Sequence, residues 1–258
     1  MLRKAQHVIK GWKANPFIRW SLRKALYRTV STRSIAHFPL RIRFPANAHF
    51  QFFFSNQVDY EPDTMRLFRK YIKSDMVFFD VGSNIGIYTL VGAHLVGPRG
   101  KVYSFEPDPQ NVTWLERNIA LNRLHNVQIH EDAVGETYGE LPFFQDTTTS
   151  RTSSILEDVW TPDAEQRTQI TVQIKPLDHY VDELDRIDVI KIDVENYEYE
   201  VLSGAKTLLQ KFRPVLFIEM SSRKKDASLQ ILEELGYHQA PIEGIAQQDL
   251  SLFLPEEP

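Results

Sequence analysis

The chain has 258 residues, of which 42% are hydrophobic and 12% aromatic, enough to build one sizeable domain with an appendage. It contains no cysteine, which excludes disulfide bonds, zinc held by thiolates and a cysteine nucleophile. The formal net charge of −4 conceals an uneven distribution, because residues 1–58 hold 11 Lys and Arg and no acid, whereas the rest of the chain holds 19 bases and 34 acids.

Residues 1–60 are predicted to form a basic accessory segment. Asn15 and Pro16 suit a helix start, and apolar residues then recur at helical spacing through Val30, opposite a face rich in Arg and Lys. Three partners fit this helix: the acidic remainder of the chain, an anionic membrane surface contacted through residues 1–30, or an anionic acceptor such as nucleic acid. Charges interrupt every apolar run there, so we expect no signal peptide or membrane span, and a cytoplasmic protein whose only membrane contact is peripheral, at the inner face.

The later part of this segment predicts a β-hairpin. Residues 40–44 alternate apolar and polar side chains, "PANA" at 45–48 offers a turn, and phenylalanines alternate again through 50–54. A second domain is expected to begin after this hairpin and to span residues 61–258.

From residue 76 the pattern changes to short apolar runs separated by helix-like stretches. The runs are MVFFD (76–80), KVYSFE (101–106), VQIHED (127–132), IDVIKID (187–193) and PVLFIEM (214–220), with helices expected near 86–96, 109–124, 197–211 and 225–236. Buried strands alternating with helices predict an α/β fold with a doubly wound, mostly parallel sheet. Further strands are expected at 140–144 and 170–174, around a long hydroxyl-rich loop, and at 250–255 as an antiparallel strand at the sheet edge.

A ligand site is predicted where the first apolar run ends. In a doubly wound sheet, ligands bind beyond the carboxyl ends of the strands, which is where Asp80 stands. The turn that follows contains Gly82, Asn84 and Gly86. A dinucleotide fingerprint starting at Gly82 would need glycines at 84 and 87, but Asn84 and Ile87 stand there. The turn therefore allows close backbone approach without being built for a pyrophosphate, which Asp80 would also repel.

The ends of the next two runs match a nucleoside that carries no phosphate. Glu106 closes the second run, where a carboxylate can accept hydrogen bonds from both hydroxyls of a ribose. Asp132 closes the third run, where it can accept from the adenine amino group while the amide of Ala133 donates to a ring nitrogen. S-adenosylmethionine has this ribose and adenine, and its ammonium and sulfonium suit nearby carboxylates. We therefore predict S-adenosylmethionine as the bound cofactor.

The ordered set of motifs resembles the FkbM-type methyltransferases over roughly residues 60–220. The motifs are DVGSNIG (80–86), EP (106–107), the hydroxyl-rich loop, LD (177–178), KIDVENYE (191–198), VLSGA (201–205) and RPVLFIE (213–219). The resemblance implies a class I, Rossmann-like methyltransferase fold, S-adenosylmethionine as methyl donor and, commonly, O-methylation of hydroxyls on sugars, glycans or secondary metabolites. Two residues depart from the family's usual pattern, Ser83 in place of alanine and Asn196 in place of glycine. The second could alter acceptor choice or require a left-handed backbone, which asparagine tolerates.

The fourth run supplies the predicted catalytic residues. Asp193 and Glu195 follow the strand expected to face the methyl donor, so Asp193 is predicted to deprotonate or orient the acceptor hydroxyl, with Glu195 as the alternate base. Lys191 lies within a buried run and is expected to pair with a carboxylate, and His179 is the remaining candidate base. Asp193, Glu195 and Glu219 could converge on a divalent metal, but their spacing does not require one.

Three other functions are compatible with these patterns. A nucleic-acid methyltransferase could use the basic segment, but no "NPPY"-like motif follows the fourth run, which makes nucleic acid the weaker acceptor. A non-catalytic, cofactor-sensing module would bind S-adenosylmethionine without turnover. A nicotinamide oxidoreductase is disfavoured by the missing glycines.

Overall fold

The computed structural model describes residues 29–46, 49–146, 153–156, 167–220, 222–241 and 250–256. The amphipathic helix expected within residues 15–30 therefore lies almost entirely outside the described residues. Within the described ranges, no helix combines the length and apolar character that crossing a bilayer requires.

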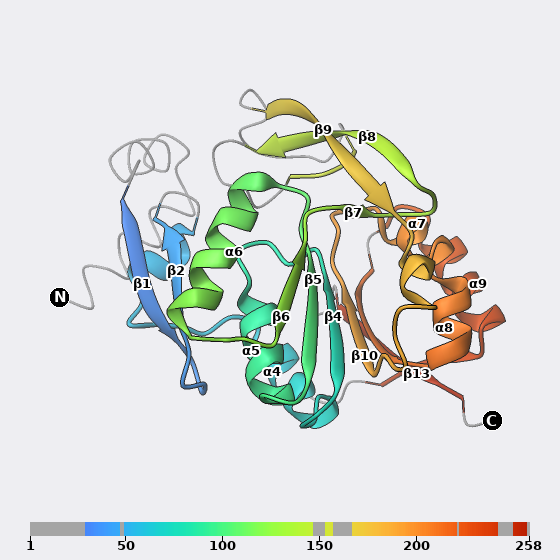
Figure 1. The fold of residues 1–258 in the computed structure, drawn as a ribbon, viewed down its shortest axis with the longest axis horizontal. Coiled ribbons are helices and arrows are strands. Elements are labelled where there is room, and N and C mark those ends of the chain that lie inside the picture. Colours follow the sequence, from blue (N-terminus) through green and yellow to red (C-terminus); the bar gives the residue numbers. More distant parts are fainter. Residues whose placement is uncertain are drawn as a thin grey trace.

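A seven-stranded sheet forms the centre of the described structure (Figure 1). In spatial order its strands are β12 (Tyr237–Ala240), β13 (Leu250–Pro255), β11 (Val215–Glu219), β10 (Val189–Ile192), β4 (Val77–Val81), β5 (Lys101–Phe105) and β6 (Val127–His130). The five strands from β11 to β6 run parallel, and each comes from one of the five apolar runs. The strand order reverses between β4 and β10, which creates the switch point where such sheets bind ligands.

Helices cover both faces of this sheet, which confirms the predicted doubly wound α/β fold (Figure 1). On one face lie α4 (Pro62–Tyr71), α5 (Ile87–Val96) and α6 (Pro109–Leu121), and on the other lie α7 (Glu198–Ser203), α8 (Lys206–Phe212) and α9 (Lys225–Glu234). The short 3-10 helix η2 (Leu177–Tyr180) packs on the second face. All four residues of β10 are buried, as a strand covered on both sides requires.

The last strand is antiparallel, as expected, but lies one position inside the sheet edge. β13 pairs antiparallel with β11 on one side and with β12 on the other. His238 and Gln239 of β12 are exposed, whereas Leu252 and Phe253 of β13 are buried. The short, polar β12 is therefore better suited to the edge than the apolar β13.

The N-terminal hairpin is built from different residues than predicted. The strands of this second sheet are, in spatial order, β2 (Arg41–Pro45), β1 (Val30–Ile35) and β3 (Gln57–Val58). Residues 50–53, expected as a strand, instead form the short helix α3 (Phe50–Phe53). The prediction was wrong because alternating phenylalanines fit one helical turn as well as a strand, with Phe52 buried against Phe44 and Phe54 exposed.

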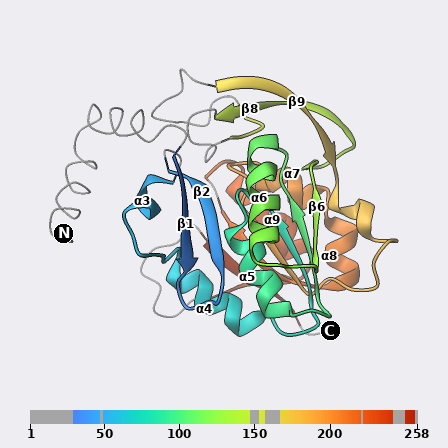
Figure 2. The ribbon, with the colours of Figure 1, turned by 60° about the vertical axis from the view of Figure 1, so that its left-hand side comes forward.

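A third sheet arches over the carboxyl ends of the central strands (Figures 1 and 2). Its strands are, in spatial order, β7 (Ala133–Val134), β9 (Arg167–Lys175) and β8 (Gly139–Asp146). β8 and β9 pair antiparallel, which confirms the extra strands expected on either side of the hydroxyl-rich loop.

Two asparagines of α6 attach the N-terminal sheet to the larger one. Asn118 accepts a 2.7 Å hydrogen bond from the amide of Arg43 and donates to its carbonyl oxygen, and Asn122 does the same for Arg41 one turn later. These amides take the place of a neighbouring strand along the edge of β2. Asn118 also donates a 2.8 Å bond to the carbonyl oxygen of Ile85, in the loop after β4. The division of the chain near residue 60 stays a prediction.

Candidate active site

A cavity of about 310 Å³ lies beyond the carboxyl ends of β4, β5, β10 and β11. Its wall includes residues 82–85 of the loop after β4. His49 and Phe52 of the N-terminal segment line it as well, as do Ser153 and Ser154 of the hydroxyl-rich loop. Three parts of the chain that are distant in sequence therefore meet at the predicted switch point.

The loop after β4 depends on glycine. Gly82 has a φ of +80°, and a Cβ atom there would lie 1.8 Å from the carbonyl oxygen of Asp193. Gly86 has a φ of +95°, and a Cβ atom there would lie 2.5 Å from Cδ1 of Leu115. Asn84 has a φ of 52°, the left-handed conformation that asparagine tolerates. Gly82 and Asn84 line the cavity, whereas Gly86 lies behind it at the start of α5.

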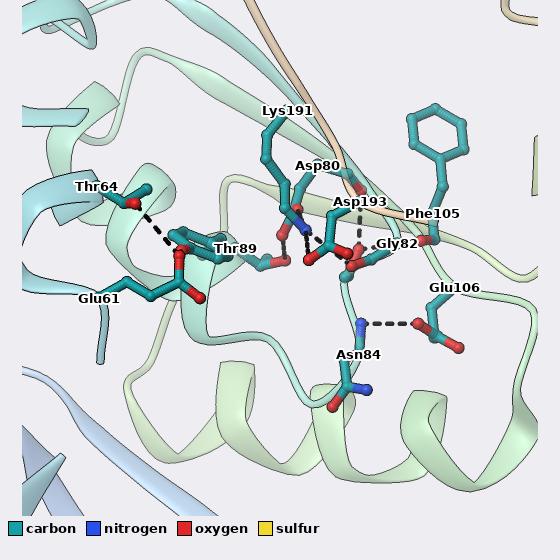
Figure 3. Close-up of polar contacts among 12 residues, drawn as sticks. Glu61, Thr64, Asp80, Gly82, Asn84, Thr89, Phe105, Glu106, Lys191 and Asp193 are labelled. Atoms are coloured by element: carbon teal, nitrogen blue, oxygen red, sulfur yellow. Dashed lines mark hydrogen bonds and ion pairs between the residues drawn. The ribbon is translucent and has the colours of Figure 1, made fainter. Parts of the chain in front are cut away.

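Glu106 follows β5 and is held firmly at the cavity wall (Figure 3). Its Oε2 accepts a 2.7 Å hydrogen bond from the amide of Asn84. Its Oε1 accepts bonds of 2.9 Å from the amide of Asp108 and 3.3 Å from the side chain of Asn111. Burial, and then the charge of Asp108, raise the pKa of Glu106 to about 7. Since each carboxylate oxygen has two lone pairs, Oε2 keeps acceptor capacity for a ligand hydroxyl.

Asp108 is a buried residue that the sequence prediction missed. Its Oδ1 accepts from the amide of Gln110, which caps α6, and from the side chain of Gln145 at 2.6 Å. Its Oδ2 accepts a 2.8 Å bond from the hydroxyl of Ser153. One side chain thus ties the start of α6 to β8 and to the hydroxyl-rich loop. The capping pattern of an aspartate before Pro109 was the signal available in the sequence.

The buried ammonium of Lys191 lies between two carboxylates (Figure 3). Its Nζ is 3.1 Å from Oδ2 of Asp193 and 3.5 Å from Oδ1 of Asp80. It also donates a 3.0 Å hydrogen bond to the carbonyl oxygen of Gly82. Burial alone lowers the pKa of Lys191, but the charges of Asp193 and Asp80 outweigh burial and raise it overall. The predicted pairing of Lys191 with a carboxylate is confirmed.

Asp80 is fully buried in β4 and does not line the cavity. Its Oδ2 accepts a 2.6 Å hydrogen bond from the hydroxyl of Thr89, and its Oδ1 faces Lys191. Burial raises the pKa of Asp80, against the opposite effects of Lys191 and Thr89. The structure therefore connects Asp80 to the site through Lys191 and α5, where the sequence had predicted direct contact with the ligand.

Asp193 and Glu219 bring two carboxyl groups together where β10 and β11 end. Both line the cavity, and a hydrogen bond joins their side chains. The charge of Asp193, followed by burial, raises the pKa of Glu219 well above its usual range. Asp193 therefore lies between the ammonium of Lys191 and the carboxyl group of Glu219, whose protonated form is favoured.

Glu195 and Asn196 form a strained turn beside Asp193. Both have left-handed backbones, with φ values of 53° and 75°, which confirms the conformation considered for Asn196. Ser154 donates a 3.1 Å hydrogen bond to the carbonyl oxygen of Glu195, and Arg223 donates one of 2.9 Å to that of Asn196. The turn places Glu195 in the cavity wall.

Asp132 and Ala133 also reach the cavity, after β6. Asp132 is already ion-paired, since Nζ of Lys175 lies 2.7 Å from its Oδ2. Ala133 is buried and pairs with Ile174 of β9. The sequence prediction placed Asp132 correctly at the strand end but did not anticipate Lys175, which lies 43 positions later.

Glu61 lines the cavity and is another residue that the sequence prediction missed. It precedes α4 and is the first residue of the predicted second domain. Tyr88 and Thr64 both donate hydrogen bonds to its Oε2, the latter at 3.2 Å. No local motif signals this residue.

His179 lies outside the cavity lining. Its Nδ1 is 3.0 Å from the hydroxyl of Tyr138, and its Nε2 is 3.3 Å from Glu183. In the part of the chain that the structure describes, no group of three or more His, Asp and Glu side chains could hold a metal ion.

Several known proteins are similar to this chain. The family model described as Methyltransferase FkbM domain matches residues 80–238. Methyltransferase 1 of Beauveria bassiana is 25% identical over 181 residues, covering 63% of this chain and 72% of the relative. The hexuronic acid methyltransferase AglP of Haloferax volcanii is 28% identical over 159 residues, covering 60% of this chain and 61% of that protein. A crystal structure of methyltransferase FkbM from Methylobacillus flagellatus KT is 22% identical with a TM-score of 0.48, covering 70% of this chain and 44% of that one.

Proposed function

Because the chain belongs to the FkbM methyltransferase family, we propose that it transfers a methyl group from S-adenosylmethionine to a sugar hydroxyl of a glycan, a glycolipid or a secondary metabolite. The observation that carries the proposal is the position of Glu106. A buried carboxylate fixed by two backbone amides at the end of the second parallel strand is suited to accept hydrogen bonds from a ribose.

The charge of the cavity suits a cationic donor. Of the described residues that line it, Lys191 carries an ammonium, and six carry carboxyl groups, namely Glu61, Glu106, Asp132, Asp193, Glu195 and Glu219. The ammonium is itself opposed by two carboxylates. A pyrophosphate would be repelled by this wall, whereas S-adenosylmethionine brings a sulfonium and an ammonium. This favours S-adenosylmethionine over a nicotinamide dinucleotide.

Each donor-binding residue has a proposed part. Glu106 accepts from the ribose hydroxyls. Asp132 and the amide of Ala133 hold the adenine, with Lys175 orienting Asp132. The loop through Gly82, Asn84 and Gly86 lets the backbone approach the ligand closely. Asp80 contributes indirectly, by holding Lys191 against that loop.

Catalysis is proposed to centre on Asp193. When bound, S-adenosylmethionine supplies an electrophilic methyl group, and the acceptor oxygen must approach it in line. Asp193 takes the acceptor proton or orients the hydroxyl, and Glu195 is the alternate base. Lys191 and Glu219 hold the Asp193 carboxylate from two sides. Holding both substrates in contact could supply roughly 7–11 kcal/mol of the barrier, and a positioned base adds roughly a hundred- to ten-thousandfold.

The acceptor is proposed from the relatives and from the cavity wall. One relative is named a hexuronic acid methyltransferase, which acts on a sugar. Ser153 and Ser154 line the same cavity, and although their O–H groups already donate to Asp108 and to the carbonyl oxygen of Glu195, their oxygens can accept from a sugar hydroxyl. The many carboxylates would repel a nucleic-acid backbone, so a nucleic-acid methyltransferase is the weaker alternative.

The basic segment supports a further part of the proposal. With 11 bases and no acid over residues 1–58, it suits peripheral contact with an anionic membrane, where a lipid-linked acceptor would be found. Vesicle sedimentation should then show binding that weakens as salt rises and that charge reversal of Arg19, Arg23, Lys24 and Arg28 abolishes. Equal pelleting with neutral and anionic vesicles would assign the segment to packing on the domain.

The activity is tested in two steps. Mass spectrometry of the purified protein should detect retained S-adenosyl ligand. A screen with methyl-labelled S-adenosylmethionine against glycan and glycolipid extracts should then label an acceptor in a reaction that Asp193→Asn suppresses. Retained ligand without transfer to any extract would instead favour a cofactor-sensing module.

A further inference from the structure

We propose that Glu61, outside the segment matched by the family model, binds the ammonium group of the donor's methionine moiety. The inference rests on the proposed use of S-adenosylmethionine. It makes the residue before α4 part of the donor site and assigns the α4 region a role beyond packing.

The carboxylate of Glu61 is held on one side only. Tyr88 and Thr64 both donate to Oε2, whereas Oε1 has no hydrogen-bond partner among the described residues. Two neutral donors thus hold one oxygen of this carboxylate, and its second oxygen can accept a hydrogen bond from a ligand in the cavity. Figure 3 shows Glu61 beside Thr64, across the site from Glu106.

The backbone of Glu61 begins α4, since its carbonyl oxygen accepts a hydrogen bond from the amide of Met65, but its side chain does not cap the helix. Glu61 occupies the N-cap position of α4 in a left-handed conformation, with a φ of 40°, and its side chain makes no capping bond. A non-glycine residue adopts this conformation only when its surroundings compensate for the strain. Here the side chain leaves the helix end and meets Tyr88, the second residue of α5, just after the loop of residues 82–86.

Tyr88 connects Glu61 to the rest of the site. Its hydroxyl binds Glu61, while its ring lies 5.0 Å from Nζ of Lys191. Burial and the charge of Glu61 raise the pKa of Tyr88 well above its usual range, so the phenol remains a neutral donor. Glu61 therefore belongs to the same arrangement as Lys191 and Asp193 while remaining accessible from the cavity.

The shape of S-adenosylmethionine indicates that its ammonium group is the partner of Glu61. S-adenosylmethionine carries adenine at one end and the amino acid at the other, with the ribose between them. If the ribose lies on Glu106 and the adenine on Asp132, the amino-acid end extends across the loop of residues 82–86 toward Tyr88 and Glu61. An ammonium, which only donates hydrogen bonds, complements an oxygen that only accepts them.

The test is calorimetric titration of the full-length protein with two probes. One is S-adenosylhomocysteine, and the other is its deamino analogue, in which hydrogen replaces the amino group. Glu61→Gln should weaken S-adenosylhomocysteine binding about tenfold, as expected for loss of a charge-assisted hydrogen bond at a partly exposed site. The same substitution should change binding of the deamino analogue less than about twofold. Asp63→Asn is the matched control, since Asp63 pairs with Arg66 at the helix surface and does not line the cavity.

Tyr88→Phe tests the arrangement from the other side. It removes the hydroxyl that fixes Glu61 and should weaken S-adenosylhomocysteine binding about threefold, again without effect on the deamino analogue. Equal losses for both probes in Glu61→Gln, or no loss for either, would overturn the assignment while leaving the proposed donor intact. If the wild-type protein binds neither probe, the proposed function itself fails, and this inference with it.

Discussion

The two ends of the cavity hold their carboxylates in different ways. Glu106 is fixed by amide groups of Asn84, Asp108 and Asn111, all of them uncharged. Asp193 instead faces the ammonium of Lys191 and a carboxyl group, that of Glu219. Neutral donors position a carboxylate without cancelling its charge. Among Lys191, Asp193 and Glu219, by contrast, the protonation of one group changes the pKa of the others. The first end is therefore suited to bind a ligand, and the second to move a proton.

Gly82 lies where the two ends of the cavity meet, and its substitution should have the largest effect on stability. Gly82 touches the carbonyl of Asp193 so closely that a Cβ atom would lie 1.8 Å from it. Gly82→Ala should therefore lower the free energy of unfolding by at least about 4 kcal/mol, combining backbone strain with displacement of β10. Gly97→Ala is the control, because φ is +69° there but nothing lies within 4 Å of the added atom. It should cost only about 1–3 kcal/mol in the same urea titration, and similar losses at both sites would show that the two ends are not tightly joined.

The burial of Glu106, at the binding end, should make the stability of the protein depend on pH. The pKa of Glu106 is raised to about 7, so the folded protein binds this proton more tightly than the unfolded chain, whose value is near 4.5. The contribution of Glu106 to stability is therefore greatest below about pH 4.5 and declines by about 3 kcal/mol as pH rises to about 7. Glu106→Gln, which cannot ionise, should remove this decline. Urea unfolding of both proteins from pH 4.5 to 8 measures it, and parallel pH profiles would contradict the buried state of Glu106.

The proton-handling end is tested by Asp193→Asn. This change keeps the shape of the side chain and removes the proposed base, so turnover should fall at least about a hundredfold, which corresponds to about 2.7 kcal/mol in the barrier. Affinity for S-adenosylmethionine should stay nearly unchanged. Near-wild-type turnover in both Asp193→Asn and Glu195→Gln would leave proximity as the main source of catalysis, because His179 does not line the cavity.

The smallest effect concerns the strained turn at Asn196. Its φ of 75° costs little for asparagine and nothing for glycine, but more for alanine. Asn196→Ala should lower the free energy of unfolding by about 1 kcal/mol, and Asn196→Gly should not lower it. Thermal unfolding of the three proteins distinguishes these cases, and equal stability of all three would mean that the turn relaxes.

The sequence predicted those features of the fold that depend on local pattern. Buried apolar runs located the parallel strands, and the strand ends located Glu106, Asp132 and Asp193 at one edge of the sheet. The resemblance to the FkbM family, which implies glycine at position 196, gave a left-handed backbone as one of two consequences for Asn196, and the structure has that backbone. These inferences succeed because strand periodicity and glycine-like conformations are properties of a few consecutive residues.

The remaining features depend on pairs that are distant in sequence. Asp108 meets Ser153 across 45 positions, and Tyr88 meets Glu61 across 27. The register that places Lys191 beside Asp80 decides whether Asp80 faces the cavity, and no local pattern contains that register. For the same reason the polar strand β1 escaped prediction, since its partner β2 defines it as a strand.

The division of the cavity into a binding end and a proton-handling end is tested most directly by calorimetry with S-adenosylmethionine. The wild-type protein should bind it and should not bind NADH. Glu106→Ala should lose roughly 2–3 kcal/mol, about thirty- to a hundred-and-fifty-fold in affinity, while Asp193→Asn stays within about twofold of wild type. Unchanged affinity in Glu106→Ala, or binding of NADH in place of S-adenosylmethionine, would contradict the account.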